Sequence, residues 1–172
     1  SRITMVYEGT NEIQAVDLLI RKIIADGGRG LDRFLDSIDA TVQQHEQGRF
    51  AEYAHQLKAL VERIRRAIAG IIEASTRHHE LPYQIAPEVL RLVGHSAFAW
   101  LWLRAAHADQ ANLDKDLGFH TEKLSTADYY YSFVLPETEQ LLSVIESSLK
   151  NSAKGRQTTF FAKAIRDACR NS

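Results

Sequence analysis

The feature that most constrains the fold is an apolar pattern that runs without interruption from residue 50 to residue 72. Within it, apolar side chains recur at steps of three and four residues, which is the spacing of one face of an α-helix. The residues on this face are Phe50, Tyr53, Leu57, Leu60, Val61, Ile64, Ile68, Ile71 and Ile72. No segment keeps the two-residue alternation of a half-buried strand for long. Because a one-faced helix must bury its apolar side against other elements, the pattern predicts an all-α protein.

Further segments carry the same helical spacing, and glycine or proline separates them. The expected helices span residues 10–25, 31–47, 49–78 and 87–111, and a fifth begins near Thr121 or Ser125. Pro136 should kink or break the fifth helix before its apolar pattern continues to Leu149. Leu81–Pro87 is expected to be a loop, because two prolines within six residues exclude a continuous helix. Together these segments predict an antiparallel helical bundle of four to six helices.

Two of the apolar faces can be specified residue by residue. The first helix presents Ile13, Val16, Ile20, Ile23 and Ile24. The fourth presents Val89, Leu90, Val93, Ala97, Trp100, Leu101 and Ala105, with Gly94 and Ala97 small enough for close helix approach. The tail after about residue 150 is expected to form one short helix or to fray.

Composition excludes several classes of partner. The chain has 172 residues, 45% of them hydrophobic, and a net charge of −1 with both signs mixed along its length. No basic stretch marks a site for nucleic acid or an anionic membrane, and no signal peptide or membrane span is visible. The single Cys169 cannot form an internal disulfide, which fits a reducing compartment, so we expect a cytoplasmic protein. The start at Ser1 rather than a methionine suggests a fragment or a processed chain.

A short polar run near the N-terminus is the best candidate for chemistry. Glu8, Gly9 and Thr10 stand in a row just before the first apolar-periodic segment. Thr10 can cap a helix there, which would place Glu8 at the mouth of that helix, beside backbone N–H groups that have no intrahelical partner. Such a corner could hold a base next to an anion. The same residues could equally form a turn, a capping residue and a solvated acid.

The segment Tyr7–Gln14 resembles the Tyr-Glu-Gly-Thr-x-x-Ile-Gln motif that precedes the last main-domain helix of acyl-CoA dehydrogenases. The resemblance implies FAD-dependent α,β-dehydrogenation of an acyl-CoA thioester. Glu8 falls on the family's catalytic base, and Gly9 on the residue whose backbone neighbours the thioester. Thr10 and Glu12 fall on positions that touch the FAD, although some members carry Gln where Glu12 stands.

Two later segments resemble the accessory C-terminal domain of larger acyl-CoA dehydrogenases. They are Gly94–Ala106 and Lys123–Tyr130, the latter followed by Val134-Leu135-Pro136. The flexible Gly-Gly-Arg-Gly stretch at 27–30 then becomes the boundary between two parts. Residues 1–28 would end the main helical domain, and residues 29–172 would form the accessory bundle.

The resemblance also implies what the chain lacks. The parent enzymes build their flavin site mainly from upstream domains, so the chain alone is expected to bind no FAD and to be inactive. Acyl-CoA, an electron acceptor and other copies of the same subunit would be partners of the intact enzyme. The first helix, without its main domain, should fold back onto the bundle or pair with the same helix of another molecule, and we favour the dimer. Removing residues 1–28 should then leave a folded helical domain.

Other patterns indicate weaker chemistry. Glu52 and His55 have the Glu-x-x-His spacing of di-iron bundles, but the sequence holds no second such motif, so a solvated pair is the better interpretation. His78-His79-Glu80 lacks a spaced third ligand for zinc and suits a helix C-terminus. We expect no metal site. The aromatic run Tyr129–Phe133 should lie partly in the core and partly at an interface. A non-catalytic helical interaction module remains the alternative function.

Overall fold

The computed structural model describes the backbone of residues 3–110 and 117–154, and the side chains of residues 10–108 and 118–154. Within these ranges every regular element is a helix, which confirms the all-α prediction. The α-helices are α1 (Ile3–Val16), α2 (Arg29–Gln44), α3 (Ala51–Ser75), α4 (Leu81–Gln110), α5 (Leu117–Tyr129) and α6 (Glu137–Ala153), and two π-helical segments are η1 (Asp17–Ile24) and η2 (Tyr130–Val134). The predicted tail helix at 160–169 lies outside the described residues.

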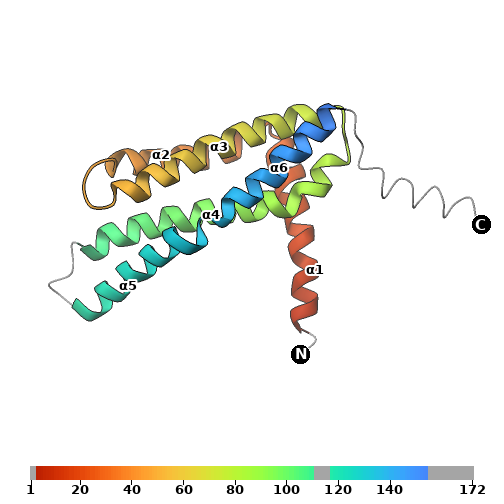
Figure 1. Ribbon diagram of the computed structural model, residues 1–172. Helices are drawn as coiled ribbons and strands as arrows, with labels where there is room; N and C mark the ends of the chain where they lie inside the picture. Colours follow the sequence, from red (N-terminus) through yellow and green to blue (C-terminus); the bar gives the residue numbers. More distant parts are fainter. Residues whose placement is uncertain (1–2, 111–116, 155–172) are drawn as a thin grey trace, which may run out of the picture.

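Helix α4 is the centre of the bundle (Figure 1). It packs against α1 and η1 near one end, against α3 and α6 along its length, and against α5 and η2. Helices α2 and α3 form an antiparallel hairpin beside it, and α6 lies against both α3 and α4. The first part of α1 projects away from the bundle, and we refer to residues 3–14 as the arm.

Helices α2 and α3 bury the faces that their sequences predict. Leu31, Leu35, Ile38 and Val42 of α2 face the core, and Phe34 packs at its edge. On α3, Leu57, Leu60, Val61, Ile64, Ile68 and Ile71 are buried, with Tyr53 and Ile72 partly buried against them. Both helices end close to the predicted residues. A strongly one-faced pattern leaves only one way to turn each helix, so prediction and structure agree.

Ion pairs fasten the outside of α3 to its neighbours. Arg65 donates to Asp32, Asp36 and Asp39 of α2 over distances of 2.7–2.9 Å. On the other side, Arg63 pairs with Glu139 and Glu146 of α6. These partly exposed ion pairs help to fix which helices lie next to α3. Each contributes little to stability, because water screens the charges.

A tight turn joins η1 to α2, as the glycine pair predicts. Gly27 and Gly28 have φ angles of 67° and 84°, which favour glycine. The Asp26 carboxylate accepts hydrogen bonds from the N–H groups of Gly28 and Gly30, and thus satisfies donors at the start of α2. A Cβ added to Gly28 would lie 3.4 Å from a methyl group of Ile72. The chain therefore turns closely against α3 at this point.

The predicted loop at Leu81–Pro87 is wrong, because α4 already begins at Leu81. Pro82 lies in the first turn, where a missing N–H removes no intrahelical bond. Pro87 lies inside the helix and does remove one. The burial of Ile85 and Ala86 before Pro87 and of Val89 after it accounts for the continued helix, since it anchors the turns that flank the proline.

The predicted face of α4 is also partly wrong. Leu92, Ala99 and Leu103 are fully buried, whereas the predicted Leu101 is 50% exposed. A Cβ at Gly94 would meet no atom within 4 Å, so this glycine does not mediate a close approach. Because α4 has neighbours on several sides, apolar residues surround much of its circumference and the pattern does not single out one face.

The fifth helix begins earlier than expected, at Leu117, and ends as predicted before Pro136. The last turn widens into η2, where the Leu135 N–H donates to the Tyr130 carbonyl five residues back at 2.8 Å. Tyr130 and Tyr131 point into the core, while Tyr129 and Phe133 are exposed. The core part of the aromatic prediction is thus confirmed, and the interface remains a prediction for the exposed residues Tyr129 and Phe133.

The first helix begins at Ile3 rather than at Thr10. No proline interrupts residues 3–10, and one glycine in a helix costs only about 1 kcal/mol, so the helix passes through Gly9. Its second half folds back onto the bundle, where Ala15, Leu19 and Ile23 join the common core. Ile13 of the predicted face is 67% exposed. The sequence predicts that the first helix either folds back onto the bundle or pairs with another molecule. Residues 15–24 show the first arrangement, because they pack on the bundle.

Candidate functional site

The four residues with predicted chemical roles all lie on the arm. Glu8, Gly9, Thr10 and Glu12 lie within five consecutive positions of α1, after its first turn. The predicted helix mouth beside Glu8 is therefore wrong, because the N–H groups without intrahelical partners belong to the helix start at residues 3–6. Positions 8 and 12 are four residues apart, so they share one side of the helix.

The described part of the arm is a surface rather than a pocket. All five residues from Thr10 to Gln14 are exposed. The Thr10 hydroxyl and the Glu12 carboxylate are groups that could hydrogen-bond a dinucleotide, and both are accessible. A cofactor of that size is normally buried over most of its surface. These residues fit one edge of an FAD site and do not make a whole site by themselves.

A second polar cluster joins α4 to η2 and α6, and sequence reasoning missed it. His95 Nδ1 lies 3.1 Å from the Tyr130 hydroxyl, and that hydroxyl donates to the His95 carbonyl oxygen. Glu137 forms an ion pair with Arg91, and its other carboxylate oxygen lies 3.4 Å from His95 Nε2. The cluster ties the start of α6 to the middle of α4. No spacing rule could have found it, because its members on α4 are 35 or more residues away along the chain from its members on η2 and α6.

Burial controls the proton affinities in this cluster. Burial and, in second place, the Arg91 guanidinium lower the pKa of His95 below its ordinary value. Burial raises the pKa of Tyr130 to about 12 and also raises the pKa of Tyr131. The histidine is thus held neutral and the tyrosines protonated at neutral pH. Such groups suit a fixed hydrogen-bond network and not a proton-transfer role at pH 7.

Two tyrosines beside this cluster, Tyr53 and Tyr131, connect neighbouring helices. The rings of Tyr53 and Tyr131 stack with centroids 4.1 Å apart. The Tyr131 hydroxyl donates to the Ala99 carbonyl oxygen at 2.7 Å, and the Tyr53 hydroxyl donates to Asp128. These contacts link α3, α4 and the junction of α5 with η2. They satisfy polar groups in the core and leave none of them directed at a ligand.

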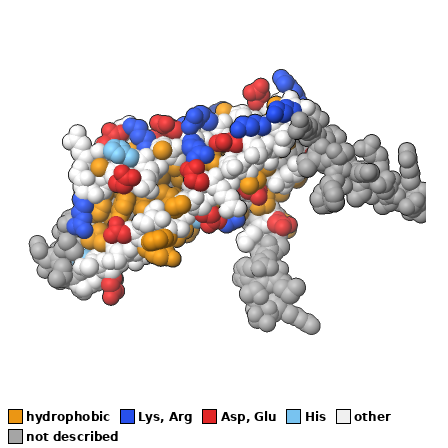
Figure 2. Space-filling view, viewed as in Figure 1, with side chains coloured by type: hydrophobic (Ala, Val, Ile, Leu, Met, Phe, Trp, Pro, Cys, Tyr) orange, Lys and Arg blue, Asp and Glu red, His pale blue; other side chains and the backbone are white. Residues whose placement is uncertain are grey.

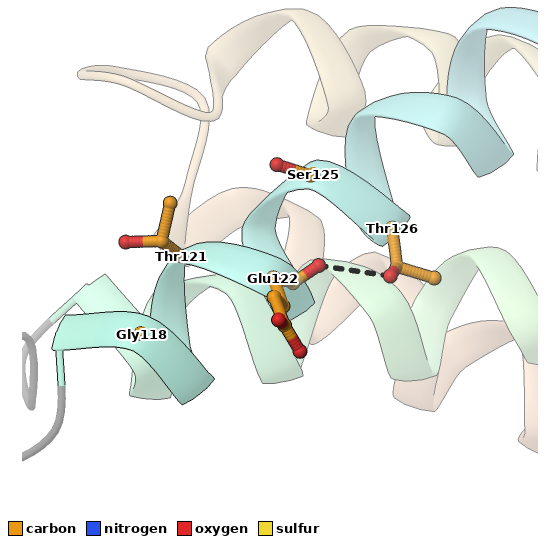
Figure 3. A pocket seen from close by; sticks show the side chains of 5 residues that line it. All are labelled: Gly118, Thr121, Glu122, Ser125 and Thr126. Atoms are coloured by element: carbon orange, nitrogen blue, oxygen red, sulfur yellow. Dashed lines mark hydrogen bonds between the residues drawn. The ribbon is translucent and has the colours of Figure 1, made fainter.

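A shallow, open depression of about 750 Å³ lies on the outer side of α5 (Figure 3). It is lined by Gly118, Thr121, Glu122, Ser125 and Thr126. The Thr126 hydroxyl donates to the Glu122 carbonyl oxygen of its own helix at 2.9 Å. Because one helix supplies every lining residue, the depression does not enclose a ligand.

Metal-ligating residues are dispersed in the part of the chain that the structure describes. No group of three or more His, Cys, Asp or Glu side chains is placed there to hold a metal ion. Glu52 and His55 are both exposed. His45 and His107 do approach each other, with ring centroids 4.5 Å apart, where α2 ends and α4 nears its end. None of the helices in the described residues is long and apolar enough to cross a membrane.

Comparison with known proteins places the bundle in a family. Residues 34–154 match the family described as acetyl-CoA dehydrogenase C-terminal like. This range runs from within α2 to the end of α6 and covers more than half of the chain, so the chain belongs to that family.

Two curated proteins are similar over most of the chain. The 3-methylmercaptopropionyl-CoA dehydrogenase of Ruegeria pomeroyi is 34% identical over 143 residues, which are 80% of this chain and 24% of the relative. The broad-specificity linear acyl-CoA dehydrogenase FadE5 of Mycobacterium tuberculosis is 30% identical over 159 residues, 86% of this chain and 26% of the relative. The chain thus spans about a quarter of the length of these relatives.

Proposed function

We propose that this chain is the C-terminal part of an FAD-dependent acyl-CoA dehydrogenase, which converts an acyl-CoA to the 2,3-enoyl-CoA. The observation that carries the proposal is the family match over residues 34–154, together with relatives that are themselves named acyl-CoA dehydrogenases. The motif at Tyr7–Gln14 supports it independently, because it precedes the matched region in the order that the intact enzymes would require. Residues 1–28 would end the catalytic domain, and residues 29–172 would form the accessory bundle.

Glu8 is the proposed base. Its carboxylate would take the proton from the α-carbon of the thioester, while the β-hydrogen leaves as hydride and a double bond forms between the two carbons. FAD, when bound, accepts that hydride. The backbone of Gly9 would lie beside the thioester, where the missing side chain leaves room for a ligand to approach. Thr10 and Glu12 would form one edge of the cofactor site and contact the cofactor there.

The arm must be completed by other parts of the intact protein. Exposed residues on a projecting helix cannot exclude water, and a base that removes a weakly acidic C–H proton needs an enclosed site. We therefore propose that the chain alone neither retains FAD nor oxidises acyl-CoA. The intact enzyme would additionally need an electron acceptor, and it would be a homo-oligomer.

The experiment uses the full-length polypeptide. If the proposal holds, the purified protein is yellow, and adding an acyl-CoA without oxygen bleaches the flavin absorbance. Glu8→Gln should keep the flavin spectrum and slow the bleaching by roughly 10²–10⁴-fold, which is the usual contribution of a general base. Glu62→Gln is the matched control, because it removes an exposed carboxylate from α3 instead of the arm.

Two results would contradict the proposal. A full-length protein that holds no flavin would favour the non-catalytic interaction module. A Glu8→Gln variant that turns over at the normal rate would remove Glu8 from the chemistry while leaving the family assignment intact. For the 172-residue chain, a flavin spectrum retained after gel filtration would show that the arm and bundle hold FAD without help.

A further inference from the structure

Exposed hydrophobic side chains gather where α4 meets the junction of α5 and η2. They are Phe98 and Leu101 of α4, Tyr129 at the end of α5 and Phe133 of η2, with exposed fractions of 59%, 50%, 61% and 73%. We call these four residues the aromatic patch. Single exposed hydrophobic residues are ordinary, but a group of large ones from two neighbouring elements marks a contact surface.

Three of the four patch residues take part in ring contacts. Tyr129 and Phe133 lie with ring centroids 5.1 Å apart. The Tyr130 ring lies between them in sequence and 6.4 Å from Phe98 across the helix pair. Phe98 and Leu101 are three residues apart, so they share one side of α4. Figure 2 shows hydrophobic side chains gathered on the lower left part of the bundle with a few acidic ones among them, whereas most Lys and Arg side chains lie along the upper edge.

The backbone beneath the patch is held firmly. Tyr131 donates to the Ala99 carbonyl oxygen, and Tyr130 donates to the His95 carbonyl oxygen. Both bonds cross from η2 to α4 next to the patch, since Tyr130 follows Tyr129 and Ala99 follows Phe98 in the sequence. The patch is therefore presented by two fastened helices, which lowers the entropy that a partner must remove on binding.

The arm indicates what lies against this surface. It projects from the lower side of the bundle, and its N-terminal end points away from the core (Figure 1). In the intact protein, the polypeptide that leads into the arm would approach the bundle from that side. The two relatives are about four times longer than the matched segment, which amounts to 24% and 26% of their length. Most of such a protein lies outside this bundle.

We propose that the aromatic patch is the surface on which the upstream catalytic part of the same polypeptide rests. This inference depends on the proposed function for the existence of that part. The arm would enter the catalytic part while the patch packs against its outside, so that the bundle is fixed at two points. Two points of attachment set the orientation of the arm, and with it the position of Glu8.

The test compares hydroxyl-radical labelling of the full-length polypeptide with labelling of the 172-residue chain. Labelling of an aromatic ring falls with its exposed area, and the centre of a protein interface is packed like a protein interior. Phe98, Tyr129 and Phe133 should therefore be labelled roughly five- to tenfold less in the full-length protein. Tyr83 is 60% exposed at the start of α4, outside the patch, and should be labelled equally in both.

A pair of variants sharpens the test. Phe98→Lys with Phe133→Lys places two charges in the patch, and Tyr83→Lys with Val144→Lys places two charges on exposed hydrophobic positions elsewhere. In the full-length protein, the patch variant should restore labelling of Tyr129 and enlarge the radius of gyration, whereas the control variant should change neither. Circular dichroism of the 172-residue chain checks that both variants keep their helices.

Three results would overturn the proposal. Equal labelling in both proteins would leave the patch uncovered. Protection that appears in the 172-residue chain and rises with its concentration would assign the patch to a second copy. Protection that survives the patch variant would place the contact elsewhere. The flavin assay separates this outcome from failure of the proposed function, because a full-length enzyme can bleach with acyl-CoA whether or not the patch is covered.

Discussion

Helix α3 and the arm are both regular helices, yet their surroundings are opposite. Eight residues of α3 are buried, and its polar side is fastened by the ion pairs of Arg63 and Arg65. On the arm, every side chain that the structure describes is exposed. Contacts within the chain thus account for how α3 is held in place. The arm carries the residues with the most specific chemical pattern, and those whose side chains the structure describes lie at the surface of the molecule.

The difference shows that two kinds of sequence signal point to two kinds of structure. Apolar spacing predicts how a segment packs within its own domain, because the partner surface is part of the same chain. The Tyr7–Gln14 motif is proposed to supply side chains for a reaction, and the rest of that proposed site would lie outside this chain. This contrast between α3 and the arm would be wrong if the arm proved to stabilise the bundle, or if the bundle proved to fold without α3.

The largest effect is expected from shortening the N-terminal helix. Deleting residues 1–28 removes Leu19 and Ile23, which are fully buried in the common core. Losing two such side chains costs roughly 4–10 kcal/mol, comparable to the whole stability of a domain of this size. We therefore expect unfolding, and not the folded remainder that the Gly27–Gly28 boundary suggested. Deleting only residues 1–14 should leave stability nearly unchanged.

Urea unfolding of the two shortened chains, followed by circular dichroism, measures this difference. If the chain without residues 1–28 unfolds at the same urea concentration as the intact chain, the contacts of Leu19 and Ile23 contribute nothing. The glycine pair would then mark an independent domain boundary.

A single substitution in α3 gives the next largest effect. Ile64 is fully buried in the middle of the helix, so Ile64→Ala should cost about 2–5 kcal/mol through lost burial and the cavity that remains. Ile64→Val removes only one methyl group and should cost about 0.5–1.5 kcal/mol. Urea midpoints of the two variants test the order. If Ile64→Ala lost less stability than Ile64→Val, the core would have collapsed to fill the space that the larger truncation leaves.

The sequence predictions are most accurate for helices that pack within the chain through a single apolar side. Helices α2 and α3 could be predicted in extent and in facing, because each has one apolar side. The facing of α4 could not, since neighbours on several sides make Leu92 and Leu101 look equivalent in sequence. Local sequence rules place a helix start at Pro87, because they do not count the burial that holds the surrounding turns.

The candidate site could be predicted in part. Glu8 and its neighbours are recognisable from the motif alone, but their place inside a continuous helix is not, because capping residues do not force a helix to begin. The cluster of His95, Tyr130 and Glu137 could not be predicted, since only the packing of α4, η2 and α6 brings it together.

An intermediate effect is expected from acidification, and it should affect the bundle alone. Burial and then the neighbouring His107 lower the pKa of His45, and burial and then Arg91 lower that of His95. A histidine whose pKa is lower in the folded state than its ordinary 6.5 binds its proton more readily when unfolded. Stability is therefore fully present above pH 6.5 and falls as the pH drops below that value.

Urea unfolding between pH 7.5 and pH 5.0, values chosen to span roughly the ordinary histidine titration, measures the slope. His95→Gln and His45→Gln should each flatten it, while His55→Gln, at an exposed position of α3, should not. A rise in stability on acidification would mean that the ion pair of His95 with Glu137 outweighs burial and Arg91.

The smallest effect is expected on the arm itself. Ile13 is 67% exposed, so Ile13→Ala removes almost no buried surface. Alanine has a higher helix propensity than isoleucine, and the two small terms together should change the stability of the 172-residue chain by less than about 0.5 kcal/mol. The same substitution in the full-length polypeptide should destabilise it measurably, because there we expect the catalytic part to surround the arm. A loss of stability in the short chain would mean that the arm already packs on the bundle. The contrast with α3 would then reflect the position of one side chain and not a missing partner.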